Sequence, residues 1–248
     1  HSKCYYDYFL LNNDNLIYKY LIISTHNIKT KSILSKEDEL LIKNFSVTWA
    51  NDYSTLASFF NNNWNIIYSL DSSLIESYSK DWSNIPGYAD ILIKPRMKIE
   101  CSIILTTCFN CNIPITISAG KTNLTGSATP QGGIILSTSL LISPDIMLDE
   151  NLKEISCPPG IPLEELRNAA IALSKGKLYY PVDPTSRHDA YVGGTISCNA
   201  SGFIPGERGA TRYWVNEIEL ILPNGELINA RRGEYVSKDG YFKLINNH

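Results

Sequence analysis

The chain has 248 residues, of which 44% are hydrophobic and 19% are charged, and its formal net charge is −3. At about 150 residues per domain, this length predicts one large domain, or one domain with an appendage. The small negative charge argues against a nucleic-acid partner, because phosphate binding needs clustered lysines and arginines. No apolar run approaches the ~18 residues that span a bilayer, which predicts no transmembrane segment.

Two short apolar patches near the N-terminus, residues 9–11 and 21–23, are broken by Asn, Asp and Lys. No small-residue cleavage site follows them, so the sequence predicts no secretory signal and a cytoplasmic location. The chain begins at His1 and stops at His248 in the middle of a pattern. We therefore expect a fragment of a longer protein.

The chain contains six cysteines, which are Cys4, Cys101, Cys108, Cys111, Cys157 and Cys198. Only Cys108 and Cys111 form a C-x-x-C pair, and no second pair or His cluster completes a zinc site. A redox pair needs a helix N-terminus to lower a thiol pKa, whereas this pair falls at the end of an apolar helical stretch, residues 99–110. We predict buried or half-buried free thiols, with a redox or metal role as the alternative.

The first 75 residues are aromatic and Asn-rich, and they contain few Gly and Pro residues. Ser35 is a candidate N-cap for a helix over residues 36–45, which has acidic residues in its first turn. A second helix is predicted over residues 54–60. Because this stretch holds no motif that carries chemistry, we interpret residues 1–75 as a helical appendage of unknown role.

From residue 79 onward, strand and helix patterns alternate. Residues 89–94 and 115–118 are short, apolar, β-branched strands, and residues 97–110 between them have apolar side chains at helical spacing. This β-α-β order predicts a parallel pair of strands with a right-handed crossover. A further strand is predicted at residues 134–137.

The later elements include one helix with clear signals at both ends. Residues 162–174 begin with Pro162 and are followed by Gly176, the asymmetry typical of a helix start and stop. A strand is predicted just before this helix, at residues 152–156.

A hairpin is predicted near the C-terminal end of the chain. The strands over residues 215–222 and 226–230 flank Asn224 and Gly225, and an Asn-Gly pair is a strong short-range hairpin signal. The parallel part therefore comes first and an antiparallel part follows. The predicted fold class is α+β.

The stretch after the 115–118 strand, SAGKTNLTGSATP at residues 118–130, is rich in Gly and small hydroxyl residues. Its Gly-Lys-Thr suggests a nucleotide phosphate loop, but that pattern needs a Gly where Ile115 stands, and G-x-G-x-x-G is also absent. A small-residue loop after a parallel strand can still present backbone N–H groups to an anion. The side chains that add donors or charge are Thr122, Thr125, Ser127 and Lys121. Local composition leaves an ordinary loop and a phosphate cradle as open interpretations.

A second stretch, residues 180–202, is dominated by small side chains from residue 193 onward. Such a stretch lets the backbone approach a flat, bulky group, because Gly lacks the Cβ that would obstruct it. His188 is interpreted as a surface or hydrogen-bonding histidine, with a catalytic base as the alternative. Arg187 is either solvated or paired with a phosphate.

Several motifs follow one another in order between residues 76 and 240. They are Tyr78-x-x-Asp81, the strand at residues 91–95, SAGKTNLTG, Pro158-Pro159-Gly160, Pro181-x-Asp183-Pro184, the stretch 193–202, Arg208-Gly209-Ala210-Thr211 and Leu222-Pro223-Asn224-Gly225-Glu226. This set resembles the PCMH-type FAD-binding domain of the vanillyl-alcohol-oxidase superfamily, and within it the FAD-linked D-lactate and glycolate dehydrogenase branch. The resemblance favours the phosphate cradle over the ordinary loop.

In that family the loop wraps the FAD diphosphate through backbone amides, although family loops often begin with Arg-Gly and carry more glycines. The diphosphate-binding residues that the resemblance implies are Ser118, Ala119, Gly120, Lys121, Thr122, Asn123, Thr125 and Gly126. The residues that it implies around the flavin are Pro184, Thr185, Gly193, Gly194, Thr195, Ser197, Cys198, Asn199 and Gly202. Family members with a covalent flavin often carry a His where this chain has Thr122, so the resemblance implies non-covalent FAD.

The resemblance further implies hydride transfer to flavin N5 from a hydroxylated small-molecule substrate, a 2-hydroxy acid such as D-lactate or glycolate. The family's substrate pocket, with its general base or metal ligands, comes largely from a C-terminal domain. We therefore expect residues 76–248 to be an FAD-binding domain truncated at its C-terminus, and we name no catalytic residue, metal ligand or electron acceptor. The alternatives are a flavin-free remnant with a structural or interaction role, and an FAD enzyme acting on a sugar, an alcohol or a nicotinamide donor.

Overall fold

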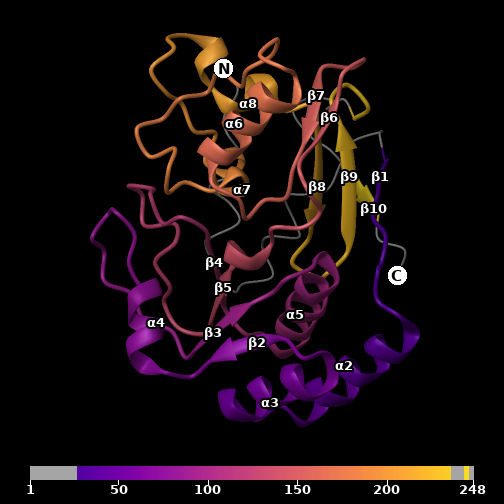
Figure 1. Cartoon of the computed structure of the whole chain (residues 1–248). Coiled ribbons are helices and arrows are strands. Elements are labelled where there is room, and N and C mark those ends of the chain that lie inside the picture. Colours follow the sequence, from indigo (N-terminus) through magenta and orange to yellow (C-terminus); the bar gives the residue numbers. More distant parts are fainter. Residues whose placement is uncertain (1–26, 236–242, 246–248) are drawn as a thin grey trace. The chain divides into compact units, whose positions relative to one another are not determined.

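The computed structural model describes residues 27–235 and 243–245 (Figure 1). The chain forms two compact units. One comprises residues 1–49, 101–112 and 216–248, and the other comprises residues 50–100 and 113–215. The division of the sequence at residue 75 stays a prediction. The N-terminal apolar patches, on which the prediction about secretion rests, lie outside the described residues. Cys4 lies outside them too.

The larger unit is built on a four-stranded sheet. Its strands, in spatial order, are β2 (Ile67–Ser69), β3 (Ile91–Lys94), β5 (Ile134–Ser137) and β4 (Ile115–Ser118). β3 and β4 each pair in parallel with β5, and β2 adds an antiparallel edge to β3. The predicted strands are confirmed, but the prediction that β3 and β4 form a pair is wrong, because β5 lies between them.

Burial explains why β5 takes the inner position. All four residues of β5 are buried, as expected for a strand covered on both faces, whereas β4 still exposes the side chain of Ile117. A strand with exposed side chains is better placed at an edge. The sequence order of the strands alone did not carry this information.

Helices connect and cover the strands of this unit. They include α3 (Tyr53–Trp64) and α4 (Ser72–Tyr78), whereas α5 (Lys98–Cys111), which follows β3 in sequence, belongs to the smaller unit from Cys101 onward. Side chains of Asp52 and Asp71 cap the first turns of α3 and α4. Ile75 of α4 packs with Leu92 and Ile135 of the sheet, which joins the helix to the strands (Figure 1).

The rest of the larger unit follows β5 in sequence. It contains η2 (Thr138–Leu140), the antiparallel pair β6 (Met147–Asp149) and β7 (Glu154–Ser156), α6 (Leu163–Leu173), α7 (Val192–Ser197), η3 (Glu207–Gly209) and α8 (Thr211–Trp214). Ile161, Leu163 and Leu166 form a core cluster with Val192. The predicted strand before α6 and α6 itself are confirmed, whereas the short helix α7 was not predicted.

The smaller unit contains the predicted hairpin. Its elements are α2 (Lys36–Thr48), most of α5, the antiparallel strands β8 (Glu217–Ile221) and β9 (Leu227–Arg231), and the parallel pair β1 (Asn27–Lys29) and β10 (Lys243–Ile245). Gly225 adopts φ = +84° in the hairpin turn, a conformation that favours Gly. Ser35 caps α2 as predicted, and the helix runs three residues beyond the predicted end.

The cysteine prediction holds for most of the described thiols. Cys108 is buried and Cys111 half-buried at the end of α5, as predicted. Burial raises the pKa of Cys108, with a further contribution from Cys111, and burial raises the pKa of Cys111 to about 11. Neither forms a thiolate near neutral pH. The expectation is wrong for Cys198, which is exposed because it follows the last turn of α7 at the surface.

The fold class is α+β, as predicted, with the parallel sheet preceding the antiparallel hairpins. In the described part of the chain, no helix combines the length and apolar character that crossing a membrane requires.

Candidate functional site

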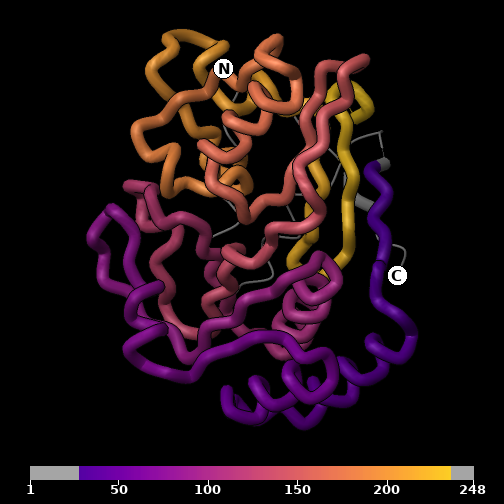
Figure 2. The backbone as a smooth tube through the Cα atoms, in the orientation of Figure 1, coloured from indigo at the N-terminus to yellow at the C-terminus, as the bar shows by residue number. Residues whose placement is uncertain are grey.

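The small-residue stretch after β4 forms an open loop, residues 118–126, which we call the amide loop (Figure 2). Within the described part of the chain, the backbone N–H groups of residues 120–124 have no hydrogen-bond acceptor. Lys121 and Gly126 both have positive φ, +56° and +76°, which turns the chain sharply on itself. Consecutive free amides in such a turn are the arrangement that binds anions.

Side chains inside the loop hold its far end. Asn123 Oδ1 accepts hydrogen bonds from the backbone N–H of Thr125 and Ser127 and from the hydroxyl of Thr125, at 3.3–3.4 Å. The hydroxyl of Thr125 therefore supports the loop. The Asn123 side chain thereby fixes an Asx-type turn in the loop.

A buried carboxylate holds the segment that follows the amide loop. Asp81 Oδ2 accepts a hydrogen bond from the N–H of Ala128, and its Oδ1 accepts one from the N–H of Ser83. Burial would raise the pKa of Asp81, but hydrogen bonds from Ser83, Ala128 and Asn123 outweigh it and lower the pKa below its usual value. Asp81 is thus a charged anchor for the loop.

The side chain of Lys121 is directed back to helix α4. Its Nζ donates a hydrogen bond of 2.6 Å to the carbonyl oxygen of Ser77 and lies 4.5 Å from the ring centroid of Tyr78. Lys94, at the end of β3, places its Nζ 4.9 Å from the same centroid. Burial would raise the pKa of Tyr78, but Lys94, Ser137 and the charge of Lys121 together lower it.

The second stretch begins with residues 183–190, which we call the wall segment, and it is fastened to α6. The backbone N–H groups of Leu163 and Glu164 donate to the carbonyl oxygens of Ala190 and Arg187. These bonds use the free N–H groups at the start of α6, where Pro162 provides no side-chain cap. The wall segment therefore takes the place of an N-cap.

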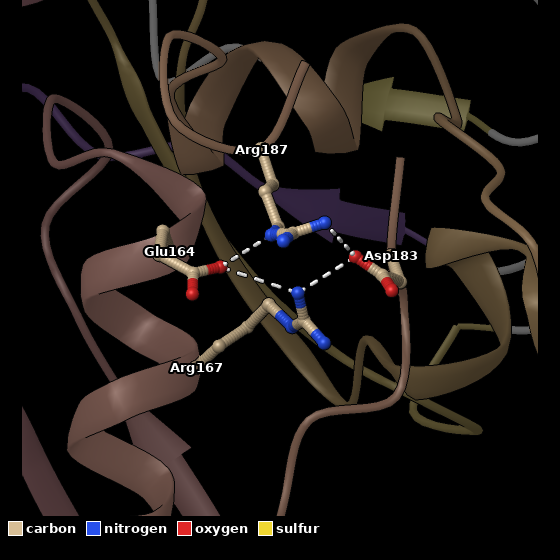
Figure 3. Close-up of polar contacts among 4 residues, drawn as sticks. All are labelled: Glu164, Arg167, Asp183 and Arg187. Atoms are coloured by element: carbon tan, nitrogen blue, oxygen red, sulfur yellow. Dashed lines mark hydrogen bonds and ion pairs between the residues drawn. The ribbon is translucent and has the colours of Figure 1, made fainter. Parts of the chain in front are cut away.

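Four charged side chains, Glu164, Arg167, Asp183 and Arg187, form a closed ring between α6 and the wall segment (Figure 3). Each guanidinium contacts both carboxylates, at N···O distances of 2.7–3.2 Å. Charges alternate around the ring, so each has two opposite neighbours. Arg187 is thus paired with two carboxylates while its side chain stays 32% exposed, an arrangement that differs from both alternatives that its sequence context suggested.

The amide loop and the wall segment meet at Gly120. A Cβ added to Gly120 would overlap the backbone carbonyl of Asp189, so a side chain there is excluded by backbone atoms. A Cβ added to Gly194 would lie 3.3 Å from the Cβ of Ala119. The structure therefore places the two small-residue stretches side by side.

Residues 193–202, the glycine segment, begin within the short helix α7. Gly193 donates its N–H to the carbonyl of Pro159, and an added Cβ would lie 2.7 Å from Pro159 Cβ. The backbone of Gly202 packs on that of Asp183. These two glycines permit close packing within the protein.

The polar side chains of the glycine segment form hydrogen bonds with nearby backbone groups. The hydroxyls of Thr195 and Ser197 donate to the carbonyl oxygens of Val192 and Gly193. Asn199 Oδ1 accepts from the N–H of Arg212. Their roles toward a flavin stay predictions.

The remaining predicted residues vary in exposure. Pro184 is buried, Thr122 is half-buried, and Thr185 and His188 are exposed. In residues 27–235 and 243–245, no group of three His, Cys, Asp or Glu side chains could hold a metal ion.

Sequence reasoning missed the charged ring and the contact of Lys121 with α4. The ring has a local signal, because Glu164 and Arg167 are three residues apart and Asp183 and Arg187 four apart. That spacing identifies the two local ion pairs, but it does not show that they contact each other. Tyr78 and Asp81 were singled out only as part of a motif, without a structural role.

Comparison with known proteins identifies related sequences. A family model described as an FAD binding domain matches residues 89–231, more than half of the chain. The matched range contains the amide loop, the wall segment and the glycine segment.

Curated relatives are oxidoreductases by name. Glycolate oxidase subunit GlcD of Bacillus subtilis (strain 168) is 33% identical over 175 residues, which cover 70% of this chain and 34% of that protein. D-lactate dehydrogenase of Anaerostipes hadrus is 30% identical over 173 residues, covering 68% and 35%. Mitochondrial D-2-hydroxyglutarate dehydrogenase of Danio rerio is 30% identical over 162 residues, covering 64% and 30%. The chain spans about a third of the length of these relatives.

Solved structures share the fold at low sequence identity. An alkyldihydroxyacetonephosphate synthase matches with a TM-score of 0.59 and 14% identity, covering 89% of this chain and 42% of that one. A variant of BBE-like 1 from Physcomitrella patens matches with a TM-score of 0.57 and 13% identity, covering 70% and 37%. These matches confirm the predicted fold.

Proposed function

The chain belongs to the FAD binding domain family, and on this premise we propose that it forms the cofactor-binding part of an enzyme that oxidises a 2-hydroxy acid. The substrate class follows from the names of the relatives, which act on glycolate, D-lactate and D-2-hydroxyglutarate. Bound FAD supplies the acceptor for a hydride from the substrate carbon that carries the hydroxyl group.

The contact between the amide loop and the wall segment carries the proposal. Gly120 has room only for a hydrogen atom against the backbone of Asp189, so the loop is held with its free amides in place. The hydroxyl of Ser118, at the start of the loop, is buried and has no hydrogen-bond partner in the described chain. An unpartnered buried hydroxyl is costly unless a hydrogen-bond partner binds there, and the half-buried or exposed amides of residues 120–124 are open to the oxygens of a diphosphate.

The residues of this chain therefore have separable tasks. The amide loop, residues 118–126, binds the diphosphate mainly through its backbone N–H groups. Wall and glycine segments line the flavin, at the positions that the sequence analysis assigned. Thr122 cannot form a histidyl bond, so FAD is held without a covalent link there.

The first test is the visible spectrum of the full natural protein after purification. We expect flavin absorption bands that leave the protein with the small-molecule fraction after denaturation. A colourless protein that also fails to take up added FAD would leave the flavin-free remnant as the correct description. Anaerobic addition of D-lactate, glycolate or D-2-hydroxyglutarate should then bleach the bands, and bleaching by none of them would reject the substrate class.

A matched pair of substitutions tests the placement of the glycine segment. Gly194→Leu puts a bulky side chain toward Ala119 and should abolish FAD retention while the protein stays folded. Gly194→Ala adds one carbon at 3.3 Å from Ala119 Cβ and should retain the cofactor. Equal FAD retention in the two variants would contradict this placement.

A further inference from the structure

Lys121 has φ = +56°, a backbone conformation that glycine adopts more easily than any other residue. An L-residue in this left-handed conformation is disfavoured by contact between its Cβ and the backbone. The conformation is nevertheless the one that directs consecutive N–H groups of the amide loop to one site. Contacts of the Lys121 side chain can offset this cost.

The tether is the contact of its ammonium group with helix α4. Lys121 Nζ lies 2.6 Å from the carbonyl oxygen of Ser77 and over the ring of Tyr78. That carbonyl belongs to the last turn of α4, where the free C=O groups of a helix attract a cation. The aromatic face adds a cation–π contact.

Tyr78 is itself fixed from a second side. Lys94, the last residue of β3, places its ammonium group 4.9 Å from the centroid of the Tyr78 ring. The ring of Tyr78 therefore contacts two ammonium groups, that of Lys94 at the end of β3 and that of Lys121 in the amide loop. None of these groups uses the loop's free N–H groups.

Resting on the proposed function, we infer that Lys121 and Tyr78 are positioning residues that preorganise the amide loop for the FAD diphosphate. The lysine acts through its tether to α4, and the backbone amides make the contact with the anion. Preorganisation raises affinity because the binding-competent conformation is already the populated one.

The direct alternative is that Lys121 leaves Ser77 and pairs with a phosphate. The two ideas differ in their dependence on salt. If Lys121 pairs with the diphosphate, removing its charge makes FAD affinity less sensitive to ionic strength. If Lys121 only holds the loop, removing its charge leaves that sensitivity unchanged.

The test uses the full natural protein with Lys121→Gly, and with Lys175→Gly as a matched control. Lys175 is also at positive φ, +53°, but it is exposed and follows α6 away from the loop. We expect Lys121→Gly to lower the fraction of molecules whose loop is ready to bind FAD from near one to about a fifth. The Kd for FAD would then rise about fivefold. Lys175→Gly should leave the Kd unchanged.

Two further variants separate the ring from the hydroxyl of Tyr78. Tyr78→Leu removes the aromatic face and should weaken FAD binding as much as Lys121→Gly. Tyr78→Phe keeps the face and should change the Kd by less than about twofold. Equal effects of Phe and Leu would overturn the role assigned to the ring.

A readout without FAD separates this inference from the proposed function. Backbone order parameters of residues 120–124 in the cofactor-free protein should fall from about 0.85 to below about 0.6 in Lys121→Gly. If wild type binds FAD but Lys121→Gly changes neither the order parameters nor the Kd, the tether is wrong. A smaller salt dependence of the Kd in Lys121→Met than in wild type would show the direct ion pair instead. If wild type binds no FAD, the proposed function fails, and the order parameters still decide the tether.

Discussion

The amide loop and the wall segment face each other at Gly120, yet they are stabilised in opposite ways. The loop leaves the N–H groups of residues 120–124 unbonded and is held by its own side chains of Lys121 and Asn123, with Asp81 holding the segment that follows it. Residues 183–190, by contrast, accept backbone hydrogen bonds from the start of α6 and carry half of the charged ring.

The difference fits the tasks that we propose for the two segments. A loop that binds an anion through its backbone cannot spend the same N–H groups on its own folding, so its order must come from side chains. The wall only has to stay in place, so it can satisfy its backbone locally and add ion pairs. The substitutions below alter the contact between the two segments, then the support of the loop, then the charged ring of the wall segment.

The largest effect is expected at the contact itself. Gly120→Ala places a Cβ against the carbonyl of Asp189, and backbone on both sides must move to admit it. We expect a loss of about 3 kcal/mol in the free energy of unfolding, as for overpacked interiors, together with loss of FAD retention. Urea unfolding and FAD titration measure these two effects. Unchanged FAD affinity in a folded Gly120→Ala protein would show that the loop and wall do not define the site.

A smaller effect is expected when the loop loses its carboxylate anchor. Asp81→Ala leaves the N–H groups of Ser83 and Ala128 without an acceptor and should cost about 2 kcal/mol. Because the folded protein lowers the pKa of Asp81, its contribution is complete above the usual value of 3.8 and is lost as the pH falls through the lower folded value. Unfolding curves of wild type and variant should therefore differ at neutral pH and converge in strong acid. A difference that grows on acidification would contradict the assigned sign.

The smallest effect is expected in the wall. Arg167→Met and Asp183→Asn each break part of the charged ring and should cost about 1 kcal/mol, since these side chains are 22–28% exposed and partly screened by water. Members of one network are not additive, so the double variant should cost little more than either single variant. A double-mutant cycle in urea, repeated at high salt, measures this coupling. Additive costs at both salt concentrations would show that the ring does not act as a unit.

Much of the fold could be predicted because its signals are local. The β-branched runs of β3, β4 and β5, the Ser35 cap of α2 and the Asn224-Gly225 turn each depend on a few neighbouring residues. Local patterns do not specify which strands become neighbours. The insertion of β5 between β3 and β4 therefore escaped prediction.

The candidate site was predicted in part for the same reason. Its two small-residue stretches are visible in the sequence, whereas their contact at Gly120 is seen in the structure. Asp81, Tyr78 and the ring partners could not be assigned roles, because each acts on a residue far along the chain. Lys121 shows this most clearly, since its partner Ser77 lies 44 positions away.

The sequence by itself determined where the chain can turn sharply and where it forms buried strands, because Gly widens the allowed backbone conformations at its own position and Pro and β-branched residues narrow them. It thereby determined the elements and the two stretches that form the cradle. Only the tertiary structure decided which carboxylate, lysine or carbonyl holds each stretch. Those choices depend on distances between segments that the local backbone preferences do not set.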